Sequence, residues 1–184
     1  CIRDRSKLAR DGGTHQNIEG VIESFELGYR MQDAMPELMD LSGENQTTLE
    51  QYGIGNSTTD GFGRQCLMAR RFAESGVRFI EISRGGWDHH NNLSTSLPER
   101  CASVDRPIAG LLQDLKDRDL LKDTLVMWGG EFGRTPDLQS RDGRGHNNKG
   151  FTIWMAGGGI RGGMSYGSTD EYGYAAAENP VSIH

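Results

Sequence analysis

The sequence contains no long apolar run, no excess of positive charge and little cysteine. None of its apolar stretches reaches the ~18 residues that a membrane-spanning helix needs, so we expect no membrane span. Its 20 Lys and Arg are outnumbered by 26 Asp and Glu, for a formal net charge of −6. We therefore do not expect the basic face that binds nucleic-acid phosphates. The three cysteines, Cys1, Cys66 and Cys101, are widely spaced without a CxxC pair, which predicts neither a disulfide framework nor a thiolate metal site.

Large apolar residues are also scarce. Leu, Ile, Val and Phe together make up about a fifth of the chain, close to the ~20% level below which highly charged chains are often disordered. The net charge is modest and the apolar residues are clustered, so we expect a folded chain with a thin core. The chain begins at Cys1 instead of Met and stops at His184 without a closing element. We therefore interpret residues 1–184 as a single partial domain, a fragment of a larger one.

Apolar periodicity predicts three helices and three strands. Helical spacing indicates helices over 18–41, which Pro36 should kink or divide, and over 62–75. Ser96 and Glu99 fit a capping box that opens a third helix. Strands are expected at 77–83, 124–128 and 151–156, loops at 42–61 and 84–92, and a Gly- and Tyr-rich irregular tail at 160–184.

The order of strand, helix and strand over 77–128 is that of a βαβ unit. Its connection is right-handed when the two strands are parallel neighbours. The expected fold class is therefore α/β, a layered sheet with flanking helices. In open sheets of this class, ligands bind beyond the carboxyl ends of the strands.

Acidic and imidazole groups follow the ends of two predicted strands. Asp88, His89 and His90 come after the first strand, and Glu131 comes after the second. Parallel strands would deliver these groups to one edge of the sheet. His146 lies just before the third strand and reaches that edge if this strand is antiparallel, or if the loop before it folds over the top.

These side chains suit a divalent cation. Carboxylates combined with two or three imidazoles favour mixed nitrogen and oxygen ligation of Zn²⁺ or Mn²⁺ over an all-oxygen Ca²⁺ site. Such a cation polarises a phosphoryl or sulfuryl oxygen and lowers the pKa of a bound water to ~7. Arg134 and Arg144 are close in sequence and would clamp an oxyanion through bidentate hydrogen bonds.

Two alternatives stay open at the level of the residues. His89 and His90 cannot both point the same way on an extended chain, so one of them is expected to be a spectator. The spacing is not a tight metal signature of the HExxH kind, so solvated loop residues are the alternative to a metal site.

Several stretches of the sequence form recognisable motifs. They are Gly85–Asn91 (GGWDHHN), Thr124–Pro136 (TLVMWGGEFGRTP), Gly143–Asn147 (GRGHN), Phe151–Gly159 (FTIWMAGGG) and Tyr166–Asp170 (YGSTD), with Phe62–Leu67 and Glu178–Val181 in addition. Together they resemble the bacterial family DUF1501. The resemblance covers nearly the whole chain, with the motifs in order, and is therefore specific.

DUF1501 in turn resembles a branch of the alkaline phosphatase and sulfatase superfamily. This resemblance implies an α/β fold with one or two metals at the strand ends, and hydrolysis of phosphate or sulfate esters by a Ser, Thr or formylglycine nucleophile. Carried over, Asp88 and His90 resemble the Asp and His of one metal site, since His90 fits the WDxH pattern. Glu131 resembles the carboxylate of an Asp-His step in which Phe132 stands where a His is expected, and His146 resembles the isolated late His ligand.

The resemblance also sets the functional expectations. The superfamily nucleophile follows the first strand, and nothing in this chain matches it, so it is expected upstream of Cys1. The expected function is a metal-dependent hydrolase of small phosphate or sulfate esters, or part of one. Phe132 motivates the alternative of a catalytically degenerate protein that binds a sulfated or phosphorylated glycan or a protein partner. A third hypothesis rests on composition: the Gly-rich tail carries Tyr166, Tyr172 and Tyr174, so residues 160–178 could form a surface that binds a partner. Members often carry a twin-arginine export signal, which implies a periplasmic or exported protein.

Overall fold

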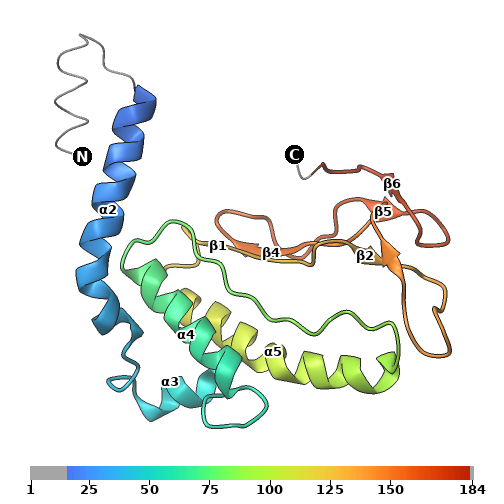
Figure 1. Cartoon of the computed structure of the whole chain (residues 1–184), viewed down its shortest axis with the longest axis horizontal. Helices are drawn as coiled ribbons and strands as arrows, with labels where there is room; N and C mark the ends of the chain where they lie inside the picture. Colours follow the sequence, from blue (N-terminus) through green and yellow to red (C-terminus); the bar gives the residue numbers. More distant parts are fainter. Residues whose placement is uncertain (1–15, 183–184) are drawn as a thin grey trace. The chain divides into compact units, whose positions relative to one another are not determined.

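The structure, a computed structural model, describes residues 16–182 (Figure 1). The chain divides into two units, Cys1–Gly43 and Glu44–His184. Among the helices of the described residues, none is long and apolar enough to cross a membrane.

The first unit contains the helix α2 (Gln16–Met39), which confirms the helix predicted over 18–41. Pro36 does not divide it. The helix continues to Met39, and the amide of Asp40 donates to the carbonyl of Pro36 at 3.1 Å. A proline removes a single amide donor from the helical ladder, and α2 accommodates that loss within its last turns.

Three helices build the core of the second unit. They are α3 (Gln46–Gln51), α4 (Asp60–Glu74) and α5 (Leu93–Asp117), and α4 packs along α5. Tyr52, Cys66, Leu67, Val104 and Leu115 are fully buried between them. The helix predicted over 62–75 is thus confirmed as α4, and the thin apolar content of the sequence is concentrated at this helical interface.

Two local predictions about the helices are wrong. The predicted loop over 42–61 contains α3, whose first turn is capped by Asn45, since its Oδ1 accepts from the amide of Thr48 at 2.8 Å. The third helix begins at Leu93 rather than at the capping box of Ser96 and Glu99, which lie inside α5. The carboxylate of Asp142, from a distant loop, accepts from the backbone amide of Ser94 at 3.2 Å and caps the first turn of α5 instead.

Within residues 16–182 the strands form three small antiparallel sheets. The strand β1 (Leu125–Trp128) pairs with β4 (Trp154–Gly157), in a register that sets Leu125 opposite Gly157 and Trp128 opposite Trp154. The strand β2 (Gly133–Arg134) pairs with β3 (His146–Asn147), and β5 (Ser168–Thr169) pairs with β6 (Ala176–Glu178). In Figure 1 these sheets lie on one side of the second unit and α4 and α5 on the other. Strands 124–128 and 151–156 are confirmed in essence, whereas β5 and β6 give the predicted irregular tail a short hairpin.

The predicted βαβ unit is wrong, although helices and strands both occur as an α/β class requires. Residues 77–83 form no strand, and every strand pair among residues 16–182 is antiparallel. Phe79 in this segment is 83% exposed. Alternating apolar residues indicate a preference for extended backbone. A strand also needs a second strand to pair with, and none of the strands among residues 16–182 pairs with residues 77–83.

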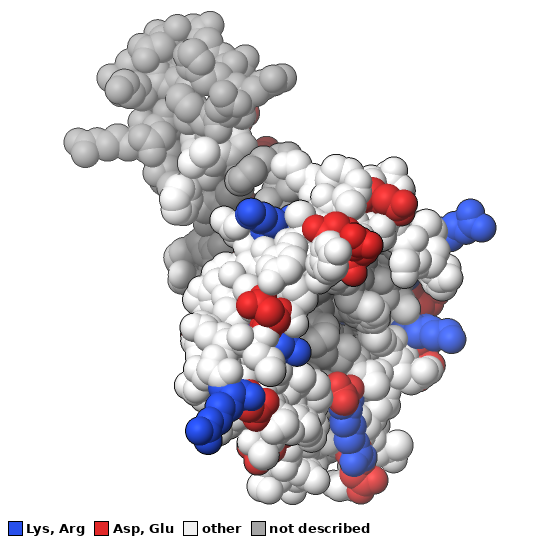
Figure 2. Space-filling model, turned by 90° about the vertical axis from the view of Figure 1, so that its right-hand side faces the viewer, with Lys and Arg blue, Asp and Glu red and all other residues white. Residues whose placement is uncertain are grey.

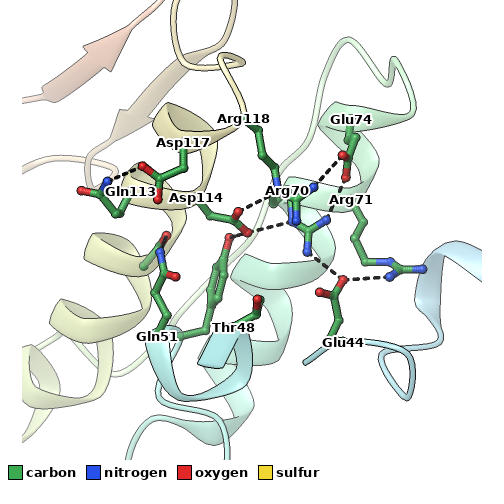
Figure 3. A network of polar contacts seen from close by, with 12 residues as sticks. Glu44, Thr48, Gln51, Arg70, Arg71, Glu74, Gln113, Asp114, Asp117 and Arg118 are labelled. Carbon is green, nitrogen blue, oxygen red and sulfur yellow. Dashed lines mark hydrogen bonds and ion pairs between the residues drawn. The ribbon is translucent and has the colours of Figure 1, made fainter. Parts of the chain in front are cut away.

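A network of charged side chains joins α4 and α5 (Figure 3). At its centre Arg70, only 3% exposed, forms ion pairs with Glu44 at 2.7 Å and Glu74 at 2.8 Å. Its Nε lies 2.9 Å from Oδ2 of Asp114, an ion pair without the alignment of a hydrogen bond. Arg70 therefore ties together three carboxylates that would otherwise repel one another.

The buried end of this network is neutralised from several sides. The hydroxyl of Tyr52 donates to Asp114 at 2.9 Å, and Nε of Arg118 donates to the same carboxylate at 2.7 Å. Burial, the charge of Asp114 and the hydrogen bond from Tyr52 to Asp114 raise the pKa of Tyr52 far above its usual range. Because buried charges are costly unless paired, this network fixes the relative placement of the helices that support the sheets.

The surface charges are mixed in sign. On the face drawn in Figure 2, acidic and basic side chains are interspersed rather than gathered by sign. This pattern agrees with the balanced composition of 20 basic and 26 acidic residues.

Candidate metal centre

Three side chains from two separate segments meet at one point. Nε2 of His90 and Nε2 of His146 each lie 3.0 Å from Oδ1 of Asp88, and the two Nε2 atoms are 3.1 Å apart. Asp88 and His90 come from the loop that precedes α5, and His146 comes from β3. These three are the only group of at least three His, Cys, Asp or Glu residues within residues 16–182 that could hold a metal ion.

The β2–β3 ladder sets the position of His146. In its register Arg134 is directly opposite His146, and opposite residues of an antiparallel pair project from the same face. Arg134 Nη1 accordingly reaches Oδ1 of Asp88 at 2.5 Å, the same oxygen that His146 contacts. Both conditions under which His146 was expected to reach this site hold: β4 runs antiparallel to β1, and the loop before β4 packs on the loop that carries Asp88.

The loop that carries Asp88 and His90 is fastened to the loop between β2 and β3. The amide of Arg144 donates to the carbonyl of His89 at 2.9 Å. Gly143 packs so closely that a Cβ there would lie 1.9 Å from the carbonyl oxygen of His90. Further along, the amide of Leu93 donates to the carbonyl of Asp142, whose carboxylate accepts from the hydroxyl of Ser94 at 2.7 Å. The absence of a side chain at position 143 is thus what lets the two loops meet.

The Asp88 carboxylate is the negatively charged group at the middle of the site. The hydrogen bond from Arg134, followed by that from His146, lowers the pKa of Asp88 to about 2. Asp88 is therefore ionised at neutral pH and carries the negative charge of the cluster. An ionised carboxylate beside two imidazole nitrogens is a donor set for a divalent cation.

Glu131 does not belong to this cluster. Its Oε1 lies 3.9 Å from Nη2 of Arg134, and its side chain is 69% exposed. The neighbouring Phe132 takes the place next to His146, with ring centroids 4.4 Å apart, and the guanidinium of Arg134 lies 5.4 Å from the Phe132 ring. Phe132, and not Glu131, is therefore the residue of this bend that lies beside His146.

The remaining sequence candidates have other surroundings. His89 is the spectator of the His89–His90 pair. Its Nε2 is buried without a hydrogen-bond partner and lies outside the cluster. Arg144 contributes its backbone amide to the contact between the two loops. One residue was not foreseen: Oε1 of Gln139 lies 2.6 Å from Nδ1 of His90. These two residues are 49 positions apart, and no local motif links them.

The triangle of ligand atoms matches the demands of a metal ion. Its edges are 3.0, 3.0 and 3.1 Å. Ligands about 2.0–2.2 Å from a Zn²⁺ ion are separated from one another by about 2.9–3.4 Å, depending on coordination geometry. Three acceptor atoms this close repel one another unless protons or a cation lie between them. The donor set therefore fits a single divalent cation with further coordination positions open.

A family match covers nearly the whole sequence, including the residues of this centre. A comparison with family models matches residues 3–184 to the family described as "Protein of unknown function (DUF1501)". The chain belongs to the DUF1501 family. No curated protein and no solved structure matches it.

The family assignment agrees with where the motifs lie. The segment Gly85–Asn91 supplies Asp88 and His90, Thr124–Pro136 supplies Arg134, and Gly143–Asn147 supplies His146, all within the residues that the family model matches. Three separate segments of the matched range thus converge on one cluster of side chains.

Proposed function

We propose that this DUF1501 chain binds a divalent cation, Zn²⁺ or Mn²⁺, at Asp88, His90 and His146, and that it is a hydrolase of phosphate or sulfate esters or the metal-binding part of one. The observation that carries this proposal is the triangle of one carboxylate oxygen and two imidazole nitrogens with edges of 3.0–3.1 Å. Two imidazoles and one carboxylate leave open positions on a tetrahedral or larger coordination sphere, as catalytic rather than structural sites require.

The residues of the site have distinct roles in this proposal. A divalent cation held there would supply Lewis acidity toward an ester oxygen and lower the pKa of a water to ~7. Asp88, His90 and His146 hold it. Arg134 donates Nη1 to Asp88, while its Nη2 is 3.9 Å from Glu131, too far for a hydrogen bond. This second nitrogen remains able to donate to an anionic phosphoryl or sulfuryl group.

We also propose that DUF1501 is a branch of the alkaline phosphatase and sulfatase superfamily, with its layered sheet. The motif resemblance supports this proposal. Export to the periplasm is part of the same proposal and rests on the same resemblance.

A second candidate function is binding of a sulfated or phosphorylated glycan, or of a protein partner, without turnover. The packing of Phe132 on His146 favours it, because an apolar ring occupies the position next to the cluster where a further ligand would be needed for a second metal. Arg134 would serve as the anion contact in this case too. The two functions differ in whether bound ester is cleaved.

The test uses the full chain loaded with Zn²⁺ or Mn²⁺ and freed of excess metal. Metal content and hydrolysis of aryl phosphate and aryl sulfate are measured for the wild type, for His146→Ala and for Glu171→Gln as a surface control. We expect about one metal per chain, with loss of metal and hydrolysis in His146→Ala only. Metal retention with ester binding but no cleavage supports the binding function. Unchanged metal content and hydrolysis in His146→Ala would overturn the metal centre.

A further inference from the structure

We propose that Gln139 is a positioning residue that fixes the tautomer of His90, so that the Nε2 lone pair is available to a metal. The inference deepens the proposed function and rests on it. Gln139 touches neither Asp88 nor His146 in the described contacts. It acts through His90 alone.

The contact itself determines the position of the proton. Oε1 of Gln139 lies 2.6 Å from Nδ1 of His90, and a carbonyl oxygen only accepts. Nδ1 of His90 must therefore carry the hydrogen. In a neutral imidazole the other nitrogen is then an acceptor, and that nitrogen is the Nε2 that faces Asp88 and His146.

The opposite tautomer of His90, with the hydrogen on Nε2, would be stabilised by Asp88. Nε2 of His90 lies 3.0 Å from Oδ1 of Asp88, so an Nε2–H group would donate well to that ionised carboxylate. This pairing would occupy the lone pair that a metal needs and would satisfy Asp88 without any cation. The acceptor at Gln139 opposes it, because an Nε2–H tautomer would leave two acceptors, Nδ1 and Oε1, facing each other at 2.6 Å.

Gln139 is itself held in place by its loop. The backbone amide of Gln139 donates to the carbonyl of Gly143 at 2.9 Å, and the backbone amide of Thr135 donates to the carbonyl of Gly145 at 3.0 Å. Oε1 of Gln139 lies against Gly145, where a Cβ would be 3.3 Å away. The hydroxyl of Tyr174 also donates to Oδ1 of Asp137, two residues before Gln139. Gln139 is exposed, but these contacts hold the backbone of its loop, which presents the acceptor to His90.

This arrangement parallels the general pattern of metal-bound histidines, whose second nitrogen donates to a carboxylate, carbonyl or water. Loss of such a partner costs about 10- to 100-fold in metal affinity. For Gln139→Ala we expect a loss in this range. For Gln139→Glu we expect an affinity equal to or tighter than that of the wild type, since a carboxylate is the stronger acceptor.

The experiment measures two quantities on the full chain. The first is the Zn²⁺ dissociation constant, by competition with a chromophoric chelator, for wild type, Gln139→Ala and Gln139→Glu. The matched control is Gln113→Ala, which removes an exposed glutamine that bonds to Asp117 within α5. The second is the tautomer of neutral His90, from ¹⁵N chemical shifts of the two ring nitrogens in zinc-free protein at alkaline pH.

We expect Nδ1–H in the wild type and in Gln139→Glu, a shift toward Nε2–H in Gln139→Ala, and weaker zinc binding in Gln139→Ala alone. An Nε2–H tautomer in the wild type would overturn the inference, as would equal zinc affinity in wild type and Gln139→Ala. If the wild type binds no zinc, the proposed function fails, and with it the role of Gln139 in metal binding, even where the tautomer is as expected. The tautomer measurement thus separates the two failures.

Discussion

Arg134 and His146 lie directly opposite each other across the β2–β3 ladder, and both contact Oδ1 of Asp88. Nε2 of His90 contacts the same oxygen, which therefore lies against one guanidinium and two imidazoles. A metal bound at Asp88 would share this oxygen with Arg134, or displace Arg134 from it.

This competition predicts a gain of metal affinity when Arg134 is removed. In Arg134→Ala, Asp88 no longer accepts from Nη1, and no positive charge lies next to the cation. We expect zinc to bind about two- to tenfold more tightly, the scale of a partly exposed charge pair, while any ester hydrolysis falls because an anion contact is lost. Chelator competition and steady-state kinetics measure the two effects. Weaker zinc binding in Arg134→Ala would show that Arg134 supports the metal ligands instead of competing with the metal.

A second prediction concerns the close approach of Gly143 to His90. A Cβ at position 143 would lie 1.9 Å from the carbonyl oxygen of His90, so Gly143→Ala must move the backbone that carries a proposed ligand. We expect a loss of about 1–3 kcal/mol in unfolding free energy, as for other overpacked sites, and weaker zinc binding. The control Gly61→Ala places a Cβ in α4 with nothing within 4 Å, and should leave stability unchanged or raise it by about 0.5–1 kcal/mol. Equal stability of the two variants in urea would contradict the packing described here.

The buried network predicts a large difference between two arginines of α4. In Arg70→Met, Asp114 keeps its ion pair with Arg118 and Glu44 keeps its ion pair with Arg71, but both lose a buried partner. We therefore expect a loss of about 1.5–3 kcal/mol in unfolding free energy, the range for hydrogen bonds to charged groups. Arg64→Ala removes only an exposed pair with Asp60, four residues away, which is worth about 0.3–0.5 kcal/mol. Urea denaturation of both variants measures the difference. A similar, small loss for both would mean that the network does not stabilise the helical core.

The same network predicts acid sensitivity through Glu44. Burial raises the pKa of Glu44, but hydrogen bonds from Arg71 and Arg70 outweigh it, so that the net pKa is lower than usual. The unfolded chain then binds the proton more tightly than the folded chain. The stabilisation of the folded protein by the Glu44 carboxylate is complete above the ordinary carboxyl pKa of about 4.3. It is lost as the pH falls toward the lower pKa of Glu44 in the folded protein. We expect the difference in unfolding free energy between wild type and Glu44→Gln to shrink between about pH 5 and pH 3. A difference that stays constant with pH would contradict this assignment.

Much of the candidate site could be predicted from the sequence, but its supports could not. Asp88, His90 and His146 stand in two short Gly-rich stretches, Gly85–Asn91 and Gly143–Asn147, where ligand-capable residues are conspicuous. The prediction for residues 77–83 was wrong because alternation of apolar residues does not specify a partner strand. Glu131 was expected at the site from its place after β1, but which way it points depends on Phe132 taking the position next to His146. Gln139 could not be found, because its partner is 49 residues away and joined to it only by the fold.

The most direct test of the metal centre is a crystal structure of the zinc-loaded chain with anomalous diffraction measured at the zinc edge. We expect one anomalous peak about 2.0–2.2 Å from Oδ1 of Asp88 and from Nε2 of His90 and His146, with Glu131 outside its coordination sphere. A zinc peak bound elsewhere, or no peak at these three atoms in fully loaded protein, would contradict the assignment of this cluster as a metal site.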